Sequence, residues 1–126
     1  MSWEDMVNNN LIAAGTVSKA AIIGLDGSLW AKSSNFNPSG DELIAATKAF
    51  TDPGSALASG LHFEGQKYFV LQADDERVIG KKSADGFFLY KTNQTVVIGL
   101  YEGGIAPGAC SVTTAHLSDY LKSTGY

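Results

Sequence analysis

The sequence predicts an α+β fold in which an antiparallel β-meander is covered by helices. The first observation is the stretch Leu61–Tyr101, which holds four short apolar runs: Tyr68–Ala73, Val78–Lys82, Phe87–Lys91 and Thr95–Tyr101. The breaks at 84–86 and 92–94 are short enough to be hairpin turns, and strands joined so closely must be antiparallel. The other two observations are a second hairpin signal nearer the N-terminus and helical spacing of apolar residues at both ends of the chain.

The N-terminal segment predicts a helix. Ser2 can cap this helix, Asp5 stands at the capping-box position, and Gly15 can supply the left-handed residue that ends it. Apolar side chains recur along one face: Trp3, Met6, Val7 and Leu11. Because the asparagines at 8–10 are poor helix-interior residues, we expect this helix to be stable only when it is packed down.

A β-hairpin is predicted next. Val17–Leu25 and Ser28–Ser33 flank Asp26-Gly27, the strongest short-range hairpin signal in the chain, and Trp30 falls in the second strand. A helix is then predicted from Gly40 to Phe50, because Ser39 can cap it and Glu42 completes the capping box. Its buried stripe would be Leu43, Ala46 or Thr47, and Phe50. Asp52-Pro53 is expected to stop this helix, and 53–60 to form a loop with room for one helical turn.

Residues 68–71 are apolar at consecutive positions. A strand with one wet face would alternate, so this run predicts that the sheet is covered on both faces. After a Gly/Pro loop at 102–108, Ala109–Ser123 has helical spacing, with one apolar stripe: Cys110, Thr114, Leu117 and Leu121. His116 and Tyr120 fall on the neighbouring stripe, turned by about 100°.

Length and composition predict one packed domain, residues 1–126. The hydrophobic content of 44% and charged content of 17% are those of a globular protein and exclude disorder. A net charge of −4 without a basic run excludes a broad nucleic-acid surface. The single cysteine favours a reducing compartment. The opening segment lacks the apolar region of a signal peptide, and no run approaches the ~18 apolar residues of a membrane span. We therefore expect a cytoplasmic protein.

Residues suited to catalysis are few. Two histidines, His62 and His116, and one cysteine, Cys110, cannot form the usual four-ligand zinc site without distant carboxylates. Cys110 and His116 fall on different faces of their predicted helix, and a lone cysteine is most often a small buried hydrophobe. The adjacent Asp74 and Asp75 would point to opposite faces of a strand. We therefore expect no enzyme, no metal site and no cofactor.

Aromatic side chains near both termini indicate binding. Trp3 lies on the first turn of one predicted helix, while Tyr120 and Tyr126 lie at the end of the other. If the two terminal helices pack side by side, these rings could gather with Trp30 from the sheet beneath. Parallel rings that carry N–H and O–H donors suit an extended proline helix, whose carbonyls are free. The alternative is that these aromatic rings seal the edge of the core.

Seven segments spread over nearly the whole chain share their order and spacing with a known family. They are MSW at 1–3, NLI at 10–12, AIIGLDGSLW at 21–30, GQKYFVLQADD at 65–75, IGKK at 79–82, KTNQTVVIGLY at 91–101 and LSDYLKSTGY at 117–126. Together they resemble the profilins, small cytosolic proteins that bind actin monomers. The resemblance implies a central antiparallel sheet with the N- and C-terminal helices on one face and shorter helices on the other.

The resemblance also implies two binding sites. Profilins hold proline-rich segments between the terminal helices, through aromatic residues that match Trp3, Trp30, Tyr120 and Tyr126. Met6 stands where the family usually has tyrosine, so we expect poly-proline binding that is weakened by about 1 kcal/mol. The actin-binding residues carried over by position are Lys67, Val70, Gln72, Lys82, Phe87, Leu89, Gly108, Ser111, Val112 and His116, with Lys81 and Lys91 close by.

Two departures from the family pattern affect charge. Gln72 replaces a common arginine, and Glu76 stands where a basic residue is usual, with Arg77 shifted by one position. Glutamine cannot make the bidentate contacts of arginine. Since each surface cation contributes roughly 1 kcal/mol of attraction to an anionic leaflet, we expect weak phosphoinositide binding that moderate salt abolishes.

The sequence therefore predicts a monomeric, cytoskeleton-associated regulator of actin polymerisation. It would bind monomeric actin on one side and proline-rich filament assembly factors on the other, without covalent chemistry. The alternative is a sheet-and-helix scaffold of the roadblock or longin type, which serves small GTPases. That alternative needs a long exposed sheet edge and leaves the terminal aromatic residues without a purpose.

Overall fold

The computed structural model describes residues 2–126, and Met1, the first residue of the MSW segment, lies outside the described residues. An α+β fold is observed. Its elements in chain order are α1 (Trp3–Asn10), a 3-10 turn (Ile12–Ala14), β1 (Lys19–Gly24), β2 (Leu29–Lys32), α2 (Gly40–Thr51), α3 (Pro53–Ser59), β3 (Leu61–Phe63), β4 (Gln66–Ala73), β5 (Arg77–Lys82), β6 (Asp85–Lys91), β7 (Thr95–Tyr101) and α4 (Pro107–Ser123).

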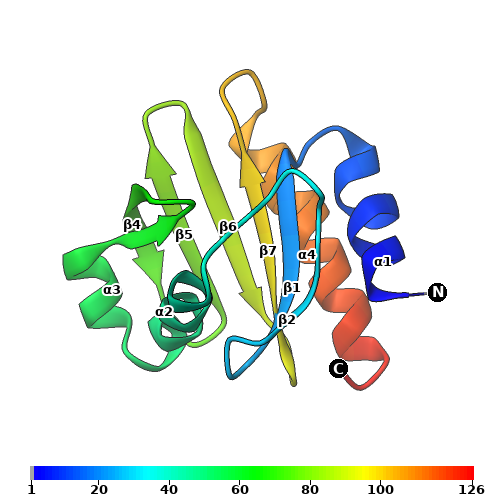
Figure 1. Ribbon diagram of the computed structural model, residues 1–126, viewed down its shortest axis with the longest axis horizontal. Coiled ribbons are helices and arrows are strands. Elements are labelled where there is room, and N and C mark those ends of the chain that lie inside the picture. Colours follow the sequence, from blue (N-terminus) through cyan, green and yellow to red (C-terminus); the bar gives the residue numbers. More distant parts are fainter. Residues whose placement is uncertain (1) are drawn as a thin grey trace.

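One sheet organises the molecule. Its seven strands lie in the order β2-β1-β7-β6-β5-β4-β3, and every neighbouring pair is antiparallel. Figure 1 shows α1 and α4 on one side of the sheet and α2 and α3 on the other, with the two termini close together. The predicted layering, with terminal helices on one face and short helices on the other, is confirmed.

Side chains from the two sheet faces form two hydrophobic layers. In β6, Phe87 and Leu89 point into the layer under α2 and α3, while Phe88 points into the layer under α1 and α4. In β7, Ile98 and Val97 divide in the same way. This alternation is the period of two expected of a strand, and it means that one residue of shift moves a side chain to the opposite face.

The predicted helix starts are confirmed by their caps. The side chains of Ser2 and Ser39 each accept a hydrogen bond from the backbone N–H three residues on. The carboxylates of Asp5 and Glu42 accept in turn from the backbone N–H of the cap residue. The Asp26-Gly27 hairpin between β1 and β2 is also confirmed. Gly15 adopts φ of 76°, but it ends the short 3-10 turn, because α1 already ends at Asn10.

Two local predictions were wrong, and one strand was not predicted. Residues 53–59 form helix α3, because Asp52 accepts the Ser55 N–H at 3.3 Å and Pro53 fits the first helical turn. The short edge strand β3 was missed. The β5–β6 turn is Ser83-Ala84 rather than 84–86, so Asp85 and Gly86 belong to β6.

The prediction that the whole sheet is covered on both faces was also wrong. Tyr68 and Val70 are buried, but Phe69 and Leu71 of the same strand are 65% and 62% exposed. Helix α4 packs on β6 and β7 and leaves the outer side of β4 open. No helix within residues 2–126 combines the length and apolarity needed to cross a membrane.

Candidate functional site

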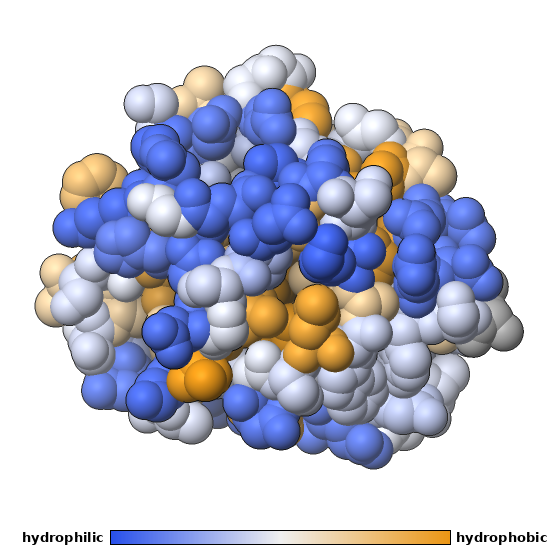
Figure 2. Space-filling model, viewed as in Figure 1, coloured by the Kyte–Doolittle hydropathy of each residue, from blue (hydrophilic) through white to orange (hydrophobic). Residues whose placement is uncertain are grey.

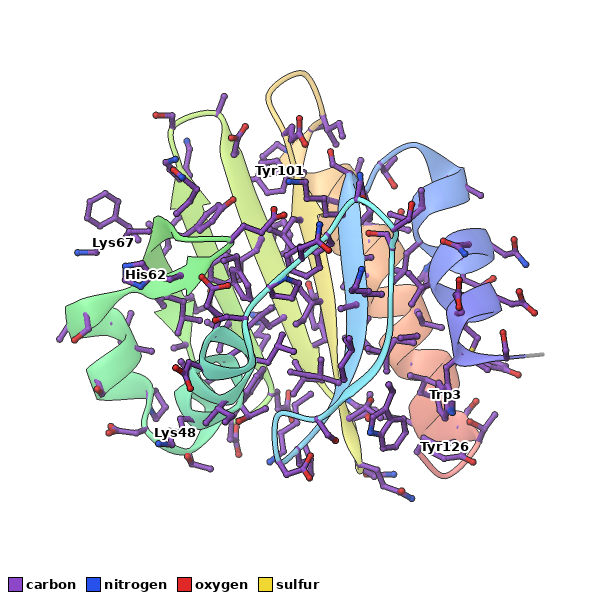
Figure 3. The ribbon with its side chains drawn as sticks, in the orientation of Figure 1. Trp3, Lys48, His62, Lys67, Tyr101 and Tyr126 are labelled. Carbon is purple, nitrogen blue, oxygen red and sulfur yellow. The ribbon has the colours of Figure 1, made fainter. Side chains whose placement is uncertain are left out.

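Three aromatic rings meet where α1, β2 and the end of the chain come together. The ring centroids of Trp3 and Trp30 are 4.9 Å apart, those of Trp3 and Tyr126 are 4.9 Å apart, and those of Trp30 and Tyr126 are 6.3 Å apart. Figure 3 shows Trp3 and Tyr126 together at the lower right, where the start of α1 meets the end of α4. We call Trp3, Trp30 and Tyr126 the aromatic cluster. Its rings meet edge to face, at 66° to 89°, rather than in parallel.

Trp30 reaches the aromatic cluster from an irregular part of β2. The register shifts there, so that Ile22 pairs with Ala31 and Ile23 pairs with Leu29, which leaves Trp30 as the extra residue of a bulge. A Cβ atom on Gly24 would lie only 2.9 Å from Nε1 of Trp30. The indole ring can therefore lie this close to the strand only because residue 24 is glycine.

Tyr126 is held by the turn between β6 and β7. Its main-chain oxygen accepts from the Gln94 N–H at 2.5 Å and from Oγ1 of Thr92 at 2.8 Å. Its N–H donates to the Leu121 carbonyl at 2.9 Å, and Nε2 of Gln94 donates to the Gly125 carbonyl at 3.1 Å. Sequence reasoning missed these contacts, because no local pattern joins residues so far apart in the chain.

The other two predicted proline-site residues lie beside the aromatic cluster rather than in it. Met6 is half-buried and packs against the hydrophobic layer under α1 and α4. Tyr120 is 52% exposed on α4, and its ring makes no aromatic pair within residues 2–126. The structure therefore brings together three of the five predicted residues, with Met6 at the margin and Tyr120 nearby on the surface.

A second exposed surface lies on the other side of α4. The strand order places β5 and β4 beyond the two strands that α4 covers, so their outward side chains remain open. Tyr90 of β6 bonds through its hydroxyl to Oγ of Ser111 at 2.6 Å, which joins this surface to the first part of α4. We call the outward residues of β4 and β5, together with Tyr90 of β6 at their border, the open sheet face: Lys67, Phe69, Leu71, Gln72, Arg77, Ile79, Lys81 and Tyr90.

The comparisons with known proteins decide the family. The profilin family model matches residues 1–126. The chain is 56% identical to Profilin-3 of Caenorhabditis elegans over 126 residues, covering 100% of both chains. Its structure is similar to the crystal structure of profilin II from Acanthamoeba castellanii, with a TM-score of 0.96, 38% identity and coverage of 99% of this chain and 100% of that one. The chain belongs to the profilin family.

A more distant structure shares the fold. Mouse profilin IIa, solved in complex with a double repeat from the FH1 domain of mDia1, has a TM-score of 0.79 at 16% identity and covers 100% of both chains. Membership of the profilin family implies actin-monomer binding and poly-proline binding by a protein that is not an enzyme. The roadblock or longin alternative is thereby left without support.

Several residues expected to contact actin do not lie on the open sheet face. Val70 is 8% exposed and Phe87 and Leu89 are 0% exposed, because all three side chains point into the layer under α2 and α3. Side chains buried to this extent offer almost no surface to a partner, so the expectation that these three side chains contact actin was wrong. Lys82 and Lys91 also follow the alternation to the opposite face from Lys81, and Lys82 donates a hydrogen bond to Oε1 of Gln66.

Other expected residues lie on the open sheet face or are exposed on the neighbouring helix α4. Lys67, Gln72 and Lys81 are exposed there, and Gly108, Val112 and His116 are exposed along α4, with Ser111 bonded to Tyr90. Sequence reasoning missed Phe69 and Leu71, the most exposed large apolar side chains of the chain that the structure describes. Strict alternation from the buried Tyr68 could have found Phe69. Leu71 is harder to place because the β4–β5 register shifts between Val70 and Gln72.

Although Gln72 is uncharged, the guanidinium of Arg77 lies beside it. With its amide oxygen turned toward Arg77, Gln72 accepts from Nε at 3.1 Å and from Nη2 at 3.3 Å. Oδ1 of Asp74 accepts from the backbone N–H groups of Arg77 and Glu76, both at 2.8 Å, and these bonds hold the pKa of Asp74 below its usual value. A fixed turn thus places the guanidinium of Arg77 beside Gln72 on the open sheet face.

Cys110 and His116, the residues considered for catalysis, lie on different sides of α4. Cys110 is buried, and burial raises the pKa of its thiol to about 11 against the opposing hydrogen bond from Thr114. His116 is exposed on the other side of α4. No group of three or more His, Cys, Asp or Glu side chains within residues 2–126 is placed to hold a metal ion.

Proposed function

We propose that this chain regulates actin polymerisation by binding monomeric actin on the open sheet face while the aromatic cluster docks a proline-rich assembly factor. The observation that carries the proposal is the arrangement of two exposed surfaces on one side of the sheet. Helix α4 lies between them, because α1 packs on β1 and β2, α4 packs on β6 and β7, and β5 and β4 follow beyond. Both surfaces can therefore be occupied at once.

The chemistry of the open sheet face fits a protein partner with an acidic surface. Phe69 and Leu71 are large apolar side chains left uncovered, and contiguous exposed apolar side chains commonly mark an interaction site. Nζ of Lys67 lies 5.3 Å from the ring centroid of Phe69. Lys81 pairs with Phe69 across the sheet, so two cations flank this apolar side chain, while Arg77 lies further along beside Asp74, Glu76 and Asp119. The cations at Lys67 and Lys81 favour association with an acidic surface.

The aromatic cluster fits a proline-rich segment. The half-buried rings of Trp3 and Trp30 and the exposed ring of Tyr126 offer apolar surface and polar tips, and an extended proline helix loses little entropy when it is fixed on them. The mouse profilin IIa complex supports this proposal through its shared fold.

The actin proposal is tested by replacing one apolar side chain on each face of the molecule. Leu71→Ser removes an exposed leucine of the open sheet face, and Leu57→Ser removes a leucine that is 47% exposed on α3, on the opposite face. Burial of one leucine contributes about 1.5–3 kcal/mol, so we expect Leu71→Ser to weaken actin binding about tenfold or more in a pyrene-actin polymerisation assay. Equal effects of the two variants would contradict the proposed surface.

The proline proposal is tested by titration with oligoproline, following tryptophan fluorescence. Trp3→Ala removes the central ring of the aromatic cluster and should abolish most of the binding, while Leu71→Ser should leave it unchanged. Unaltered actin binding by Trp3→Ala shows that this variant is folded. Absence of a spectral change in the unmodified protein at millimolar peptide would refute proline binding.

Weak phosphoinositide binding is proposed on the same charges. Lys67, Arg77 and Lys81 attract an anionic headgroup, but the net charge of −4 opposes it, and moderate salt screens what remains. We also propose a monomer in the cytoplasm, associated with the cytoskeleton through actin. Co-sedimentation with phosphoinositide vesicles tests the lipid contact, and strong binding at physiological ionic strength would contradict it.

A further inference from the structure

The surroundings of Trp30 indicate that the proline site also distinguishes ligands by the charge of the residues that flank their prolines. We propose, on the basis of the proline binding proposed above, that the aromatic cluster prefers proline-rich segments with a lysine or arginine beside the proline run, and that Asp26 is the residue that recognises this cation.

Asp26 lies at the Trp30 end of the aromatic cluster. A Cβ atom built on Gly24 would lie 2.8 Å from Oδ1 of Asp26, 2.8 Å from Oγ of Ser28 and 2.9 Å from Nε1 of Trp30. The carboxylate and the indole nitrogen thus lie close together over Gly24 of the β1–β2 hairpin. Asp26 is exposed, so its carboxylate can meet a ligand that is seated on Trp30 and extends toward the hairpin turn.

The residue spacing of a proline helix is compatible with the distance between the Trp3 and Trp30 rings. A proline helix rises about 3.1 Å per residue, so rings 4.9 Å apart are bridged by between one and two residues. In a ligand that runs from Trp3 across Trp30, the residue after the proline run lies toward the β1–β2 turn that holds Asp26. Because proline itself carries no charge, any electrostatic preference must come from such a flanking residue.

The charge of Asp26 is free to act on a ligand. Within residues 2–126 the ion pair found is Lys19 with Glu64, at 2.6 Å, so no cation of the described chain neutralises Asp26. The hydroxyl and N–H of Ser28 donate to Oδ1 at 2.6 and 3.0 Å. These hydrogen bonds, the hydroxyl first, hold the pKa of Asp26 below its usual value, and the carboxylate is ionised at neutral pH.

The elements around the aromatic cluster add to the negative field. The first turn of α1, which begins at Trp3, holds Glu4 and Asp5. The cation on the last turn of α4 is Lys122, while Lys32 of β2 donates to the Ser33 carbonyl at 3.4 Å. A cationic flank therefore meets a complementary surface, and an acidic flank meets repulsion.

The variant Asp26→Asn isolates the charge. An asparagine Oδ1 can accept the same two hydrogen bonds from Ser28, and Asn-Gly is as favourable a hairpin sequence as Asp-Gly. The turn is therefore kept while the negative charge is removed. Glu102→Gln is the matched control. Glu102 is an exposed carboxylate that follows Tyr101, and Figure 3 shows Tyr101 at the opposite end of the molecule from Trp3 and Tyr126.

The experiment measures the affinity of three peptides by tryptophan fluorescence. Each holds about ten prolines, flanked at both ends by lysine, by glutamine or by glutamate. The unmodified protein should bind the lysine peptide about two- to fivefold more tightly than the glutamine peptide, as expected of one exposed ion pair. It should bind the glutamate peptide least tightly. High salt should shrink these differences.

The variants decide what causes the preference. Asp26→Asn should bind the glutamine peptide like the unmodified protein but lose the preference for lysine, whereas Glu102→Gln should keep it. Equal affinity for all three peptides, a preference that survives in Asp26→Asn, or an equal loss in Glu102→Gln each overturns the inference while proline binding stands. Absence of binding to any peptide overturns proline binding and this inference together.

Discussion

Replacing Glu42 with alanine should destabilise the protein far more than the loss of an ordinary helix cap. Its Oε1 accepts from the backbone N–H of Ser39 at 2.9 Å and of Glu64 at 2.8 Å, and its Oε2 accepts from the N–H of Gly65 at 2.8 Å. One carboxylate thus joins the start of α2 to the β3–β4 turn. That turn has positive φ at both Glu64 (54°) and Gly65 (78°), which is unfavourable for the glutamate and needs support.

The magnitude follows from the number and kind of these bonds. A hydrogen bond to a charged group contributes about 1.5–3 kcal/mol, and water can replace part of each bond at this half-exposed site. We therefore expect Glu42→Ala to lower the free energy of unfolding by about 2–3 kcal/mol, or the melting temperature by about 10 °C for a chain of this size. Glu42→Gln keeps one carbonyl acceptor and should lose about half as much.

Asp5 supplies the matched control, because it occupies the same capping-box position in α1. It accepts a single bond, from the Ser2 N–H at 3.4 Å, and touches no second element. Asp5→Asn should therefore cost less than about 0.5 kcal/mol. Urea titrations of the three variants, followed by tryptophan fluorescence, measure the difference. If Glu42→Ala costs no more than Asp5→Asn, the contacts to the β3–β4 turn contribute nothing and the reasoning is wrong.

The pH dependence provides an independent check on Glu42. Partial burial raises the pKa of this carboxyl, but the hydrogen bonds from Gly65, Ser39 and Glu64 outweigh burial and hold the pKa below its ordinary value of 4.5. A carboxyl whose pKa is lowered by folding stabilises the protein above the unfolded pKa, and this stability is lost as the pH falls through the folded value. The difference in stability between the unmodified protein and Glu42→Gln should therefore narrow between about pH 6 and pH 3.

Three further outcomes are expected. Gly99→Ala should destabilise by about 1–3 kcal/mol in urea titrations, because its Cβ would overlap the Thr114 side chain on α4; adding Thr114→Ala should recover part of this loss, and strict additivity would refute the contact. Cys110, buried and with its thiol pKa raised to about 11, should resist a thiol reagent at pH 8 until urea unfolds the protein; rapid labelling of the folded chain would contradict this. Met6→Tyr should tighten oligoproline binding by about 1 kcal/mol in the fluorescence titration, and no gain would show that residue 6 lies off the ligand path.

The elements that sequence reasoning predicted correctly depend on contacts within a few residues. The Ser2 and Ser39 caps and the Asp26-Gly27 turn are closed by groups three residues apart or fewer, so their patterns are visible in the chain itself. Helix α3 shows where local patterns become ambiguous. Asp52-Pro53 both ends α2 and begins α3, and only the helical break was inferred from it.

The errors on the sheet arose from tertiary structure. Whether Phe69 and Leu71 are covered depends on how far α4 extends across the strands, and no residue near them encodes that distance. Sequence reasoning also did not predict the groove between α2 and α3. A groove of about 450 Å³ lies there, beside Lys48, yet none of the residues predicted to bind a ligand lines it. Figure 2 shows this side of the molecule as mostly polar, with hydrophobic side chains at its lower centre.

Three residues expected to contact actin were placed on the wrong face of the sheet, because side chains alternate between the two faces along a strand. Val70, Phe87 and Leu89 were carried over by position along the chain, but each side chain points to the face opposite the open one. In β6 the pairing with β5 and β7 has no register shift. The face of the sheet to which one side chain points therefore fixes the faces of all the others. In β4 the register shift at Leu71 breaks this rule, so the face of a residue after the shift follows from its partner in β5.

The same shift changes the meaning of the charge substitutions. In the chain, Gln72 and Arg77 are five positions apart, and the loss of an arginine at 72 suggested a weaker basic surface. In the sheet, the turn that Asp74 closes brings the Arg77 guanidinium to 3.1 Å from the Gln72 amide oxygen, so a cation still occupies that part of the open sheet face. Restoring arginine at position 72 would therefore bring two guanidinium groups together, and repulsion between them would offset the attraction gained toward an acidic partner. Charge on this face is set by which residues meet across β4 and β5, and a comparison made position by position along the chain overstates what Gln72 removes.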